Sequence, residues 1–289
     1  MIQRLSQPIN GDAAPGAAAL ARATPGAAAR CLTVTTSIIA VLGIVAAVCR
    51  MGFGIEHGPI DVISLIDLQA ESSLPAWYSS MLLALAAALL GLIGWNKAAR
   101  RQRFVWHWVV LAFIFALLSA DETIQFHERA AWPVERIFKL KGAFLYGWVI
   151  PALMFVGAVG IGYVKFLQHL PAATRRRFIL AGAVYVGAAL GLEMVEGVWD
   201  TSHGKENGVY LAMVAVEEVF EMVGIVIFIH ALLAYARDQW GAITLQLAPP
   251  EHFVQHHFNA RQVTPDRPGS APPDRAGAAA AARPDPLGV

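Results

Sequence analysis

Six long apolar runs divide the chain, and each is close to the ~20 residues that an α-helix needs to cross a bilayer. The runs lie at 32–49, 76–95, 104–122, 143–164, 178–199 and 209–236. The first, second and fourth contain no Asp, Glu, Lys or Arg, whereas the other three carry acidic residues. We therefore predict an all-α, polytopic membrane helix bundle with six transmembrane helices, formed by residues 31–240.

The two ends of the chain have a different composition. Residues 1–30 are rich in Ala, Gly and Pro and show no helical or strand period, which predicts a disordered N-terminal tail. Residues 241–289 are rich in Pro, Ala and Arg, which predicts a second, largely disordered tail. A cleavable signal places its small residues after the apolar run, but here they come before it. We therefore expect the first run to remain as a membrane anchor.

Composition supports the membrane class and excludes several others. The chain has 289 residues, 56% hydrophobic and 15% charged, with a mean hydropathy of +0.51. A soluble domain is usually ~45–50% apolar and ~25% charged. The net charge of +1 gives no basic surface for a nucleic acid, and two cysteines cannot form a disulfide scaffold. The expected partners are membrane lipid and a lipid-soluble substrate, or another membrane protein.

Basic residues in the short loops predict the orientation, because cytoplasmic loops carry an excess of Lys and Arg. Two loops, 96–103 and 165–177, each contain four basic residues and no acid. Segment 51–75 contains four acidic residues and no Lys or Arg. This pattern predicts that both termini are cytoplasmic and that segment 51–75 is outside. Arg50 lies at the outer end of the first run, where we expect it to snorkel to the interface.

Acidic side chains inside three apolar runs are the main functional signal, because charges within a bilayer are rare and usually face a bundle interior. At 100° per residue, Asp121, Gln125 and Glu128 share one face of the third helix. Glu193, Glu196 and Asp200 share one face of the fifth helix in the same way. On the sixth, Glu217 and Glu221 lie one turn apart and Glu218 flanks them. With the predicted orientation, all three groups fall in the outer half of the bilayer.

So many carboxylates in a low dielectric need compensation from protons, water or bound cations. A divalent metal ion (Fe, Mn, Zn or Mg) suits an oxygen-rich site with a histidine. We predict Glu193, Glu196, Glu217 and Glu221 as metal ligands, with Asp121 or His127 completing the shell. Glu122 or Glu128 would then act as the acid/base group. The alternative for Glu122, Glu128 and Asp200 is an ordinary interfacial position where a helix leaves the membrane. Seven aromatic residues are expected to anchor the helices at the interfaces: Trp77, Tyr78, Trp95, Trp106, Trp108, Trp132 and Trp148.

Three functions remain open at this point. The first is a metal-dependent membrane enzyme that acts on a lipid or a lipid-soluble molecule, since the predicted site lies at membrane depth. The second is a cation or proton-coupled transporter, although the chain shows no internal repeat and its acids lie on one side only. The third is a structural or assembly subunit of a membrane complex whose acids meet basic residues of a partner.

Three stretches resemble the signatures of an uncharacterised bacterial family of six-span membrane proteins. They are ESSLPAWYSS at 71–80, LSADETIQFHE at 118–128 and EEVFEMVG at 217–224. The resemblance implies a location in the bacterial inner membrane and brings no activity with it. It also implies a shared polar set, which comprises Glu71, Asp121, Glu122, His127, Glu128, Glu217, Glu218 and Glu221. Ser119, Asp121 and His127 also echo ceramidase-like membrane hydrolases, but the paired histidines of that family are missing, so its function is not carried over.

Overall fold

The computed structural model describes residues 25–53 and 62–240, which lie in one unit, Met1–Thr244. These residues contain helices and no strands. The segments in chain order are α1 (Pro25–Phe53), α2 (Val62–Ile66), α3 (Leu74–Ala99), α4 (Val105–Ile124), α5 (Phe126–Phe138), η1 (Gly142–Phe144), α6 (Val149–His169), α7 (Ala172–Val186), η2 (Gly187–Leu192), α8 (Glu193–His203) and α9 (Gly208–Trp240).

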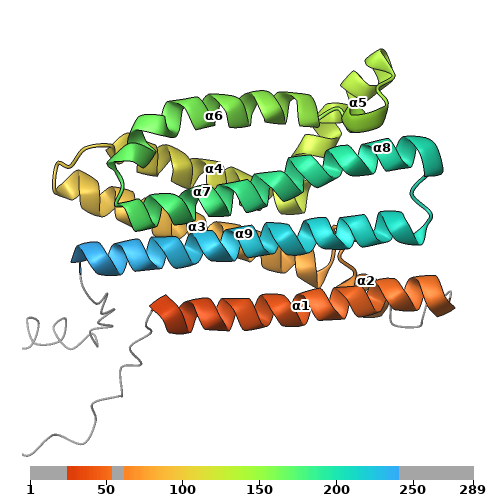
Figure 1. The fold of residues 1–289 in the computed structure, drawn as a ribbon, viewed down its shortest axis with the longest axis horizontal. Helices are drawn as coiled ribbons and strands as arrows, with labels where there is room; N and C mark the ends of the chain where they lie inside the picture. Colours follow the sequence, from red (N-terminus) through yellow and green to blue (C-terminus); the bar gives the residue numbers. More distant parts are fainter. Residues whose placement is uncertain (1–24, 54–61, 241–289) are drawn as a thin grey trace, which may run out of the picture. The chain divides into compact units, whose positions relative to one another are not determined.

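The prediction of an all-α protein with six membrane-length helices is confirmed for the described residues. Six helices are long and apolar enough to cross a bilayer, with α7, η2 and α8 forming one continuous span, Ala172–His203. The turns alternate between two ends of the bundle (Figure 1). We call the end with the α8–α9 loop and α5 the acidic end, and the end with the α3–α4 and α6–α7 turns the basic end.

The predicted tails fall mainly outside the described residues, which exclude 1–24 and 241–289. Helix α1 nevertheless begins at Pro25, within the segment predicted as a tail. Proline is favoured at the first helical position, where its missing N–H needs no partner. Three alanines, 27–29, then continue the helix with the highest helical propensity of any residue. The low complexity of this stretch therefore concealed a helix start.

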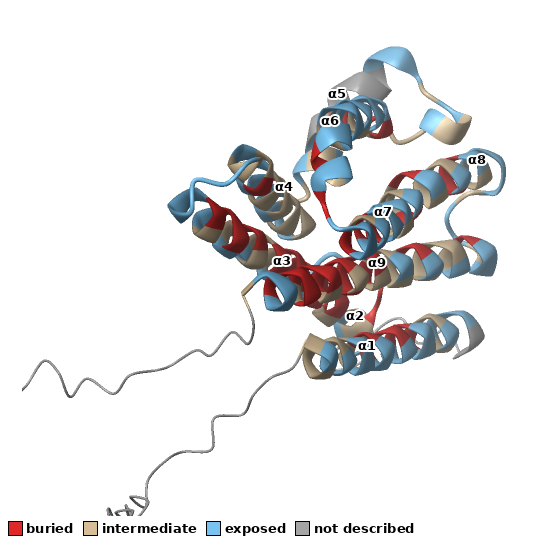
Figure 2. Ribbon diagram, turned by 60° about the vertical axis from the view of Figure 1, so that its left-hand side comes forward, coloured by how far each residue is buried: buried red, intermediate tan, exposed pale blue. Residues whose placement is uncertain are grey.

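Helix α9 forms the centre of the packed core. It contacts α1, α3, α7 and α8 along its length, and its fully buried residues include Met222, Ile225, Ile229 and Leu232. Figure 2 shows buried positions concentrated on α3 and α9, whereas α6 is largely exposed. Since α6 makes few close contacts with the other spans, it forms a separate wall of the structure.

Gly224 allows α7 and α9 to approach each other closely. A Cβ atom at this position would lie 2.8 Å from the backbone nitrogen of Tyr185 and 3.0 Å from its Cα. Because backbone atoms cannot move aside as a side chain can, we expect Gly224→Ala to destabilise the protein by about 1–3 kcal/mol, as overpacking typically does. Thermal unfolding in detergent measures this effect. Gly91→Ala is the control, since its Cβ would meet nothing within 4 Å, and equal melting temperatures for the two variants would contradict the packing argument.

The prediction that Asp121, Gln125 and Glu128 share one continuous helical face is wrong. Helix α4 ends at Ile124, Gln125 has a left-handed φ of 57°, and a new helix begins at Phe126. The side chain of Asp121 accepts the backbone N–H of His127 at 3.0 Å, while its carbonyl accepts the N–H of Gln125 at 2.7 Å. The bond to Gln125 is the last of the α4 helical pattern. The bond to His127 stabilises the break, because it pairs an N–H that has lost its helical acceptor.

The fourth apolar run also begins differently from the prediction. The predicted run starts at 143, but helix α6 starts at Val149. The preceding residues form η1 and a turn, in which Gly142 adopts a positive φ of 63°. This arrangement carries Tyr146 and Trp148 over the acidic end of the bundle, where both line a cavity.

Arg50 does not simply snorkel, as the sequence suggested. Its guanidinium forms an ion pair with Asp67, whose side chain is almost fully buried. Asp67 also accepts the backbone N–H of Gln69 through its other oxygen at 3.2 Å. This basic residue at the outer end of the first run is therefore paired with an acid of segment 51–75.

Candidate functional site

A cavity of about 1160 Å³ lies among α3, α4, α6, α7–α8 and α9. All eight site residues predicted from the sequence line it: Asp121, Glu122, His127, Glu128, Glu193, Glu196, Glu217 and Glu221. Glu71 and Glu218 line it as well. The structure therefore brings together side chains from four separate stretches of the chain, while their chemical roles stay predictions.

Three of these carboxylates form a tight cluster, which we call the glutamate trio: Glu193, Glu196 and Glu217. One oxygen of each lies within 4.8 Å of the other two, so the three oxygens could surround a single metal ion. Glu196 and Glu217 are only 2% and 7% exposed. The Oε1 atom of Glu196 is buried and has no hydrogen-bond partner. A buried carboxylate oxygen without a partner is costly, which is why such atoms usually have a proton donor or a cation beside them.

A π-helical segment precedes the trio. η2 interrupts the span between α7 and α8 and ends at Leu192, directly before Glu193. Its wider turn shifts the register of all side chains that follow it, compared with a continuous α-helix. Both Glu193 and Glu196 face the cavity. Gly187–Leu192 thus sets the direction in which these two glutamates point.

The trio does not include Glu221, Asp121 or His127. Asp121 instead pairs with His127: its Oδ2 lies 2.5 Å from Nδ1 of the imidazole. The His127 ring centroid lies 4.7 Å from that of Trp148, whose indole N–H donates to Glu193 Oε1 at 3.3 Å. Trp148, predicted as an interfacial anchor, therefore connects the Asp121–His127 pair with the trio.

The Asp121 carboxylate controls the charge of His127. Burial works to lower the pKa of His127, but the hydrogen bond and the negative charge of Asp121 outweigh it, so the pKa is raised above its ordinary value. A raised histidine pKa stabilises the fold fully below the unfolded-state pKa, and the contribution is lost as pH rises through the folded-state pKa.

We expect the thermal stability of the wild type to decline across that window, and His127→Asn to remove this component of the decline. Melting temperatures measured from pH 5 to pH 9 test it. His203→Asn is the control, because this exposed histidine on α8 does not line the cavity. An unchanged pH profile in His127→Asn would contradict the assignment.

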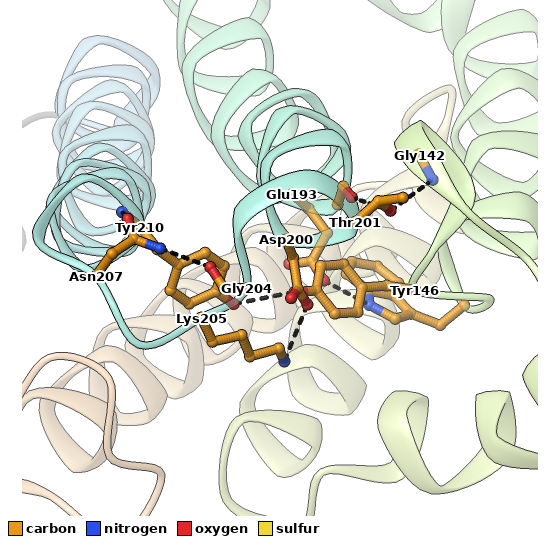
Figure 3. A network of polar contacts seen from close by, with 11 residues as sticks. Gly142, Tyr146, Glu193, Asp200, Thr201, Gly204, Lys205, Asn207 and Tyr210 are labelled. Carbon is orange, nitrogen blue, oxygen red and sulfur yellow. Dashed lines mark hydrogen bonds and ion pairs between the residues drawn. The ribbon is translucent and has the colours of Figure 1, made fainter.

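A second polar network lies at the acidic end of the cavity (Figure 3). The phenol of Tyr146 donates to Asp200 Oδ2 at 3.0 Å and lies 3.0 Å from the hydroxyl of Tyr210. Lys205 Nζ lies 4.0 Å from the same Asp200 oxygen and 4.7 Å from the ring of Tyr146. Burial and the neighbouring Tyr210 raise the pKa of Tyr146, so this phenol stays protonated and acts as a donor.

The network contains groups that sequence reasoning did not assign to the site. Lys205 supplies a cation beside the acids, and Tyr146 and Tyr210 supply hydroxyl groups. Asp200, predicted on the same helical face as Glu193 and Glu196, bonds to Tyr146. The available signal was weak: Lys205 lies in a short loop of nearly balanced charge, and Tyr146 lies inside an apolar run.

Glu71 adds a carboxylate from the segment before α3. Desolvation by the surrounding protein raises the pKa of Glu71, a hydrogen bond with Gln125 opposes the shift, and the charge of Glu128 increases it. Since Gln125 is the left-handed residue between α4 and α5, the break in the third span places an amide beside this carboxylate. The resemblance had included Glu71 in the shared polar set, and it lines the same cavity.

Comparison with known proteins supports the expectation of an uncharacterised family and adds no activity. No curated protein and no solved structure matches the chain. One family model, described as a domain of unknown function (DUF8692), matches residues 36–236. The match begins inside α1 and ends inside α9, so it includes every residue of the cavity named above. The chain therefore belongs to the DUF8692 family.

Proposed function

We propose that this protein is a metal-dependent membrane enzyme that acts on a lipid or a lipid-soluble molecule. The observation that carries the proposal is the glutamate trio, in which three carboxylate oxygens lie within 4.8 Å of one another beside a large cavity. A divalent cation would offset the repulsion among these groups and provide the partner that Glu196 Oε1 lacks.

The chemistry of the trio suits a hard or borderline cation. Carboxylate oxygens are the ligands that Mg²⁺ and Mn²⁺ prefer, and Fe²⁺ and Zn²⁺ also accept them. Three protein ligands leave coordination positions for water or substrate, as catalytic metal sites require. Such an ion supplies Lewis-acid polarisation of a substrate oxygen or a bound water. Elemental analysis of the purified protein identifies which of these ions is bound.

Acid/base groups lie around the trio. The Asp121–His127 pair has the arrangement of an oriented imidazole, in which the carboxylate fixes one ring nitrogen and leaves the other for proton transfer. Both oxygens of Asp121 contact His127, so we propose that this pair transfers protons beside the metal. Glu122 and Glu128, which line the same cavity, remain proposed acid/base groups, and Glu221 remains a proposed metal ligand.

The location we propose is the bacterial inner membrane, with the acidic end outside and both termini in the cytoplasm. The four basic residues of each of the loops 96–103 and 165–177 support this orientation. Reporter fusions after Arg101 and Arg176 should be cytoplasmic, and fusions after Asp67 and His203 should be periplasmic. A cytoplasmic signal after Asp67 would contradict the placement of the site in the outer half of the bilayer.

Conversion of membrane lipid tests the enzymatic proposal. The purified protein is reconstituted with a total bacterial lipid extract, loaded with each candidate metal in turn, and lipid species are followed by mass spectrometry. We expect the amount of one lipid class to change with time in the wild type. No lipid class should change when chelator is present or in the Glu217→Gln variant. The control Glu206→Gln, an exposed acid outside the cavity, should behave as the wild type.

A metal-loaded wild type that converts no lipid would contradict the proposed enzymatic function. A cation or proton-coupled transporter would then be the better account of the same acids. Cation flux into proteoliposomes that depends on Glu217 would identify that alternative directly.

A further inference from the structure

The cavity changes its chemical character at one level of the bundle. On α4 the lining changes from Leu111–Leu118 to Asp121 and Glu122. On the α7–α8 span it changes between Leu190 and Glu193, and on α9 between Gly224 and Glu221. Three independent helices thus place acids toward one end and apolar side chains toward the other. A cavity with this division matches the polarity of an amphiphile. It has a polar compartment lined by the acids and an apolar limb lined by the residues nearer the basic end.

The apolar limb is long enough for a complete lipid chain. Along α6 its lining extends from Ala152 to Leu167, which is about 22 Å at 1.5 Å per residue. The hydrocarbon core of a bilayer is ~30 Å thick, so the chains of one leaflet occupy about half of that. Aromatic rings line the limb on several sides, and they comprise Phe115, Phe155, Tyr163, Phe166, Phe178 and Phe228.

The polar compartment favours a positively charged head group over a negatively charged one. Nine carboxylate side chains line the cavity, against one lysine and one histidine. The six carboxyl groups outside the trio can accept hydrogen bonds from an ammonium group whether they are ionised or protonated. An anionic head would add to the repulsion in a low dielectric, whereas an ammonium group would reduce it.

We propose that the cavity binds an amphiphile with a single long apolar chain and an amine head group, the head lying among the carboxylates and the chain along α6. The inference names the substrate class of the proposed enzyme and rests on that function only for turnover. Binding itself requires the cavity and its acids, so it can be tested separately from metal content and catalysis.

Gly160 offers a way to block the limb without disturbing the fold. It lines the cavity, and a Cβ atom there would meet nothing within 4 Å. Gly160→Leu should therefore fill the limb partway along α6. Gly157, on the same helix, also has open space around its Cβ position but does not line the cavity, so Gly157→Leu is a matched control.

The test compares binding of hexadecylamine, hexadecanol and hexadecanoate to the detergent-solubilised, metal-loaded protein. We expect the amine to bind most tightly and the carboxylate least tightly. Gly160→Leu should weaken hexadecylamine binding by more than about tenfold, because several methylenes would lose their apolar surroundings. The same variant should affect octylamine less, and Gly157→Leu should bind as the wild type.

If hexadecanoate bound most tightly, the head-group assignment would be overturned. If Gly160→Leu and Gly157→Leu bound hexadecylamine equally, the position of the chain along α6 would be overturned. Metal content is measured on the same samples. A full metal complement with no preference among the amphiphiles would contradict this inference alone. Chain and head-group selectivity in a protein that binds no metal would contradict the proposed enzyme and support the binding inference.

Discussion

Glu196→Gln should abolish metal-dependent stabilisation, because Glu196 is the most deeply buried member of the trio. The amide keeps the shape of the side chain but removes a negative ligand charge from a hard cation. A ligand that binds only the folded state at 100 times its dissociation constant stabilises it by about 2.7 kcal/mol. We expect added metal to raise the melting temperature of the wild type and to leave that of Glu196→Gln unchanged. Glu206→Gln should respond to metal as the wild type does.

The melting temperature of Glu196→Gln without added metal distinguishes between two explanations of the trio. If the three carboxylates only share protons, a neutral amide relieves their repulsion, and the variant melts at an equal or higher temperature than the wild type. If they hold a tightly bound ion, the variant as purified melts lower. A stabilised Glu196→Gln variant together with a metal-insensitive wild type would contradict the metal site.

Arg50→Ala should destabilise the protein strongly, because it removes the charged partner of a buried carboxylate. Asp67 is only 4% exposed, so loss of the guanidinium leaves a buried carboxylate without its charged partner. Removing one member of a buried ion pair costs 3–5 kcal/mol. The Arg50 side chain is 39% exposed, so we expect a smaller loss of about 2–3 kcal/mol, since solvent screens part of the interaction. Titration of the purified, detergent-solubilised protein with a denaturing detergent measures this loss in the free energy of unfolding.

A double-mutant cycle shows whether the ion pair causes this loss. Adding Asp67→Asn to Arg50→Ala removes the buried charge and should recover part of the stability. The matched control is Arg30→Ala, an exposed arginine on α1, which should cost little. Additive effects of the Arg50 and Asp67 substitutions would show that the two side chains do not interact.

The six spans could be predicted because an apolar helix that crosses a bilayer needs a minimum length, which the sequence displays directly. The shared level of the acids could be predicted for a related reason. The rise per residue of a helix converts sequence position into depth in the membrane. The acids lie near the ends of the third and fifth runs and near the start of the sixth, so they reach the same depth. The structure places all eight predicted side chains around one cavity.

Groupings within the cavity could not be predicted, because they depend on contacts between distant segments. Tyr146 and Tyr210 meet across 64 positions of the chain, and Trp148 and Glu193 across 45. The break at Gln125 was also missed, because it lies just beyond the third apolar run and the side chain of Asp121 decides the turn. The π-helical segment before Glu193 has no hydrophobic signature of its own, although it changes which way Glu193 and Glu196 face.

The metal content of the purified wild type tests the central claim most directly. The protein is stripped with chelator, incubated with Mn, Fe, Zn or Mg, freed of unbound ions and measured by elemental analysis beside Glu196→Gln and Glu206→Gln. We predict about one ion per chain in the wild type and in Glu206→Gln, and little or none in Glu196→Gln. No metal bound above the Glu196→Gln level in the wild type, for any of the four ions, would contradict the account.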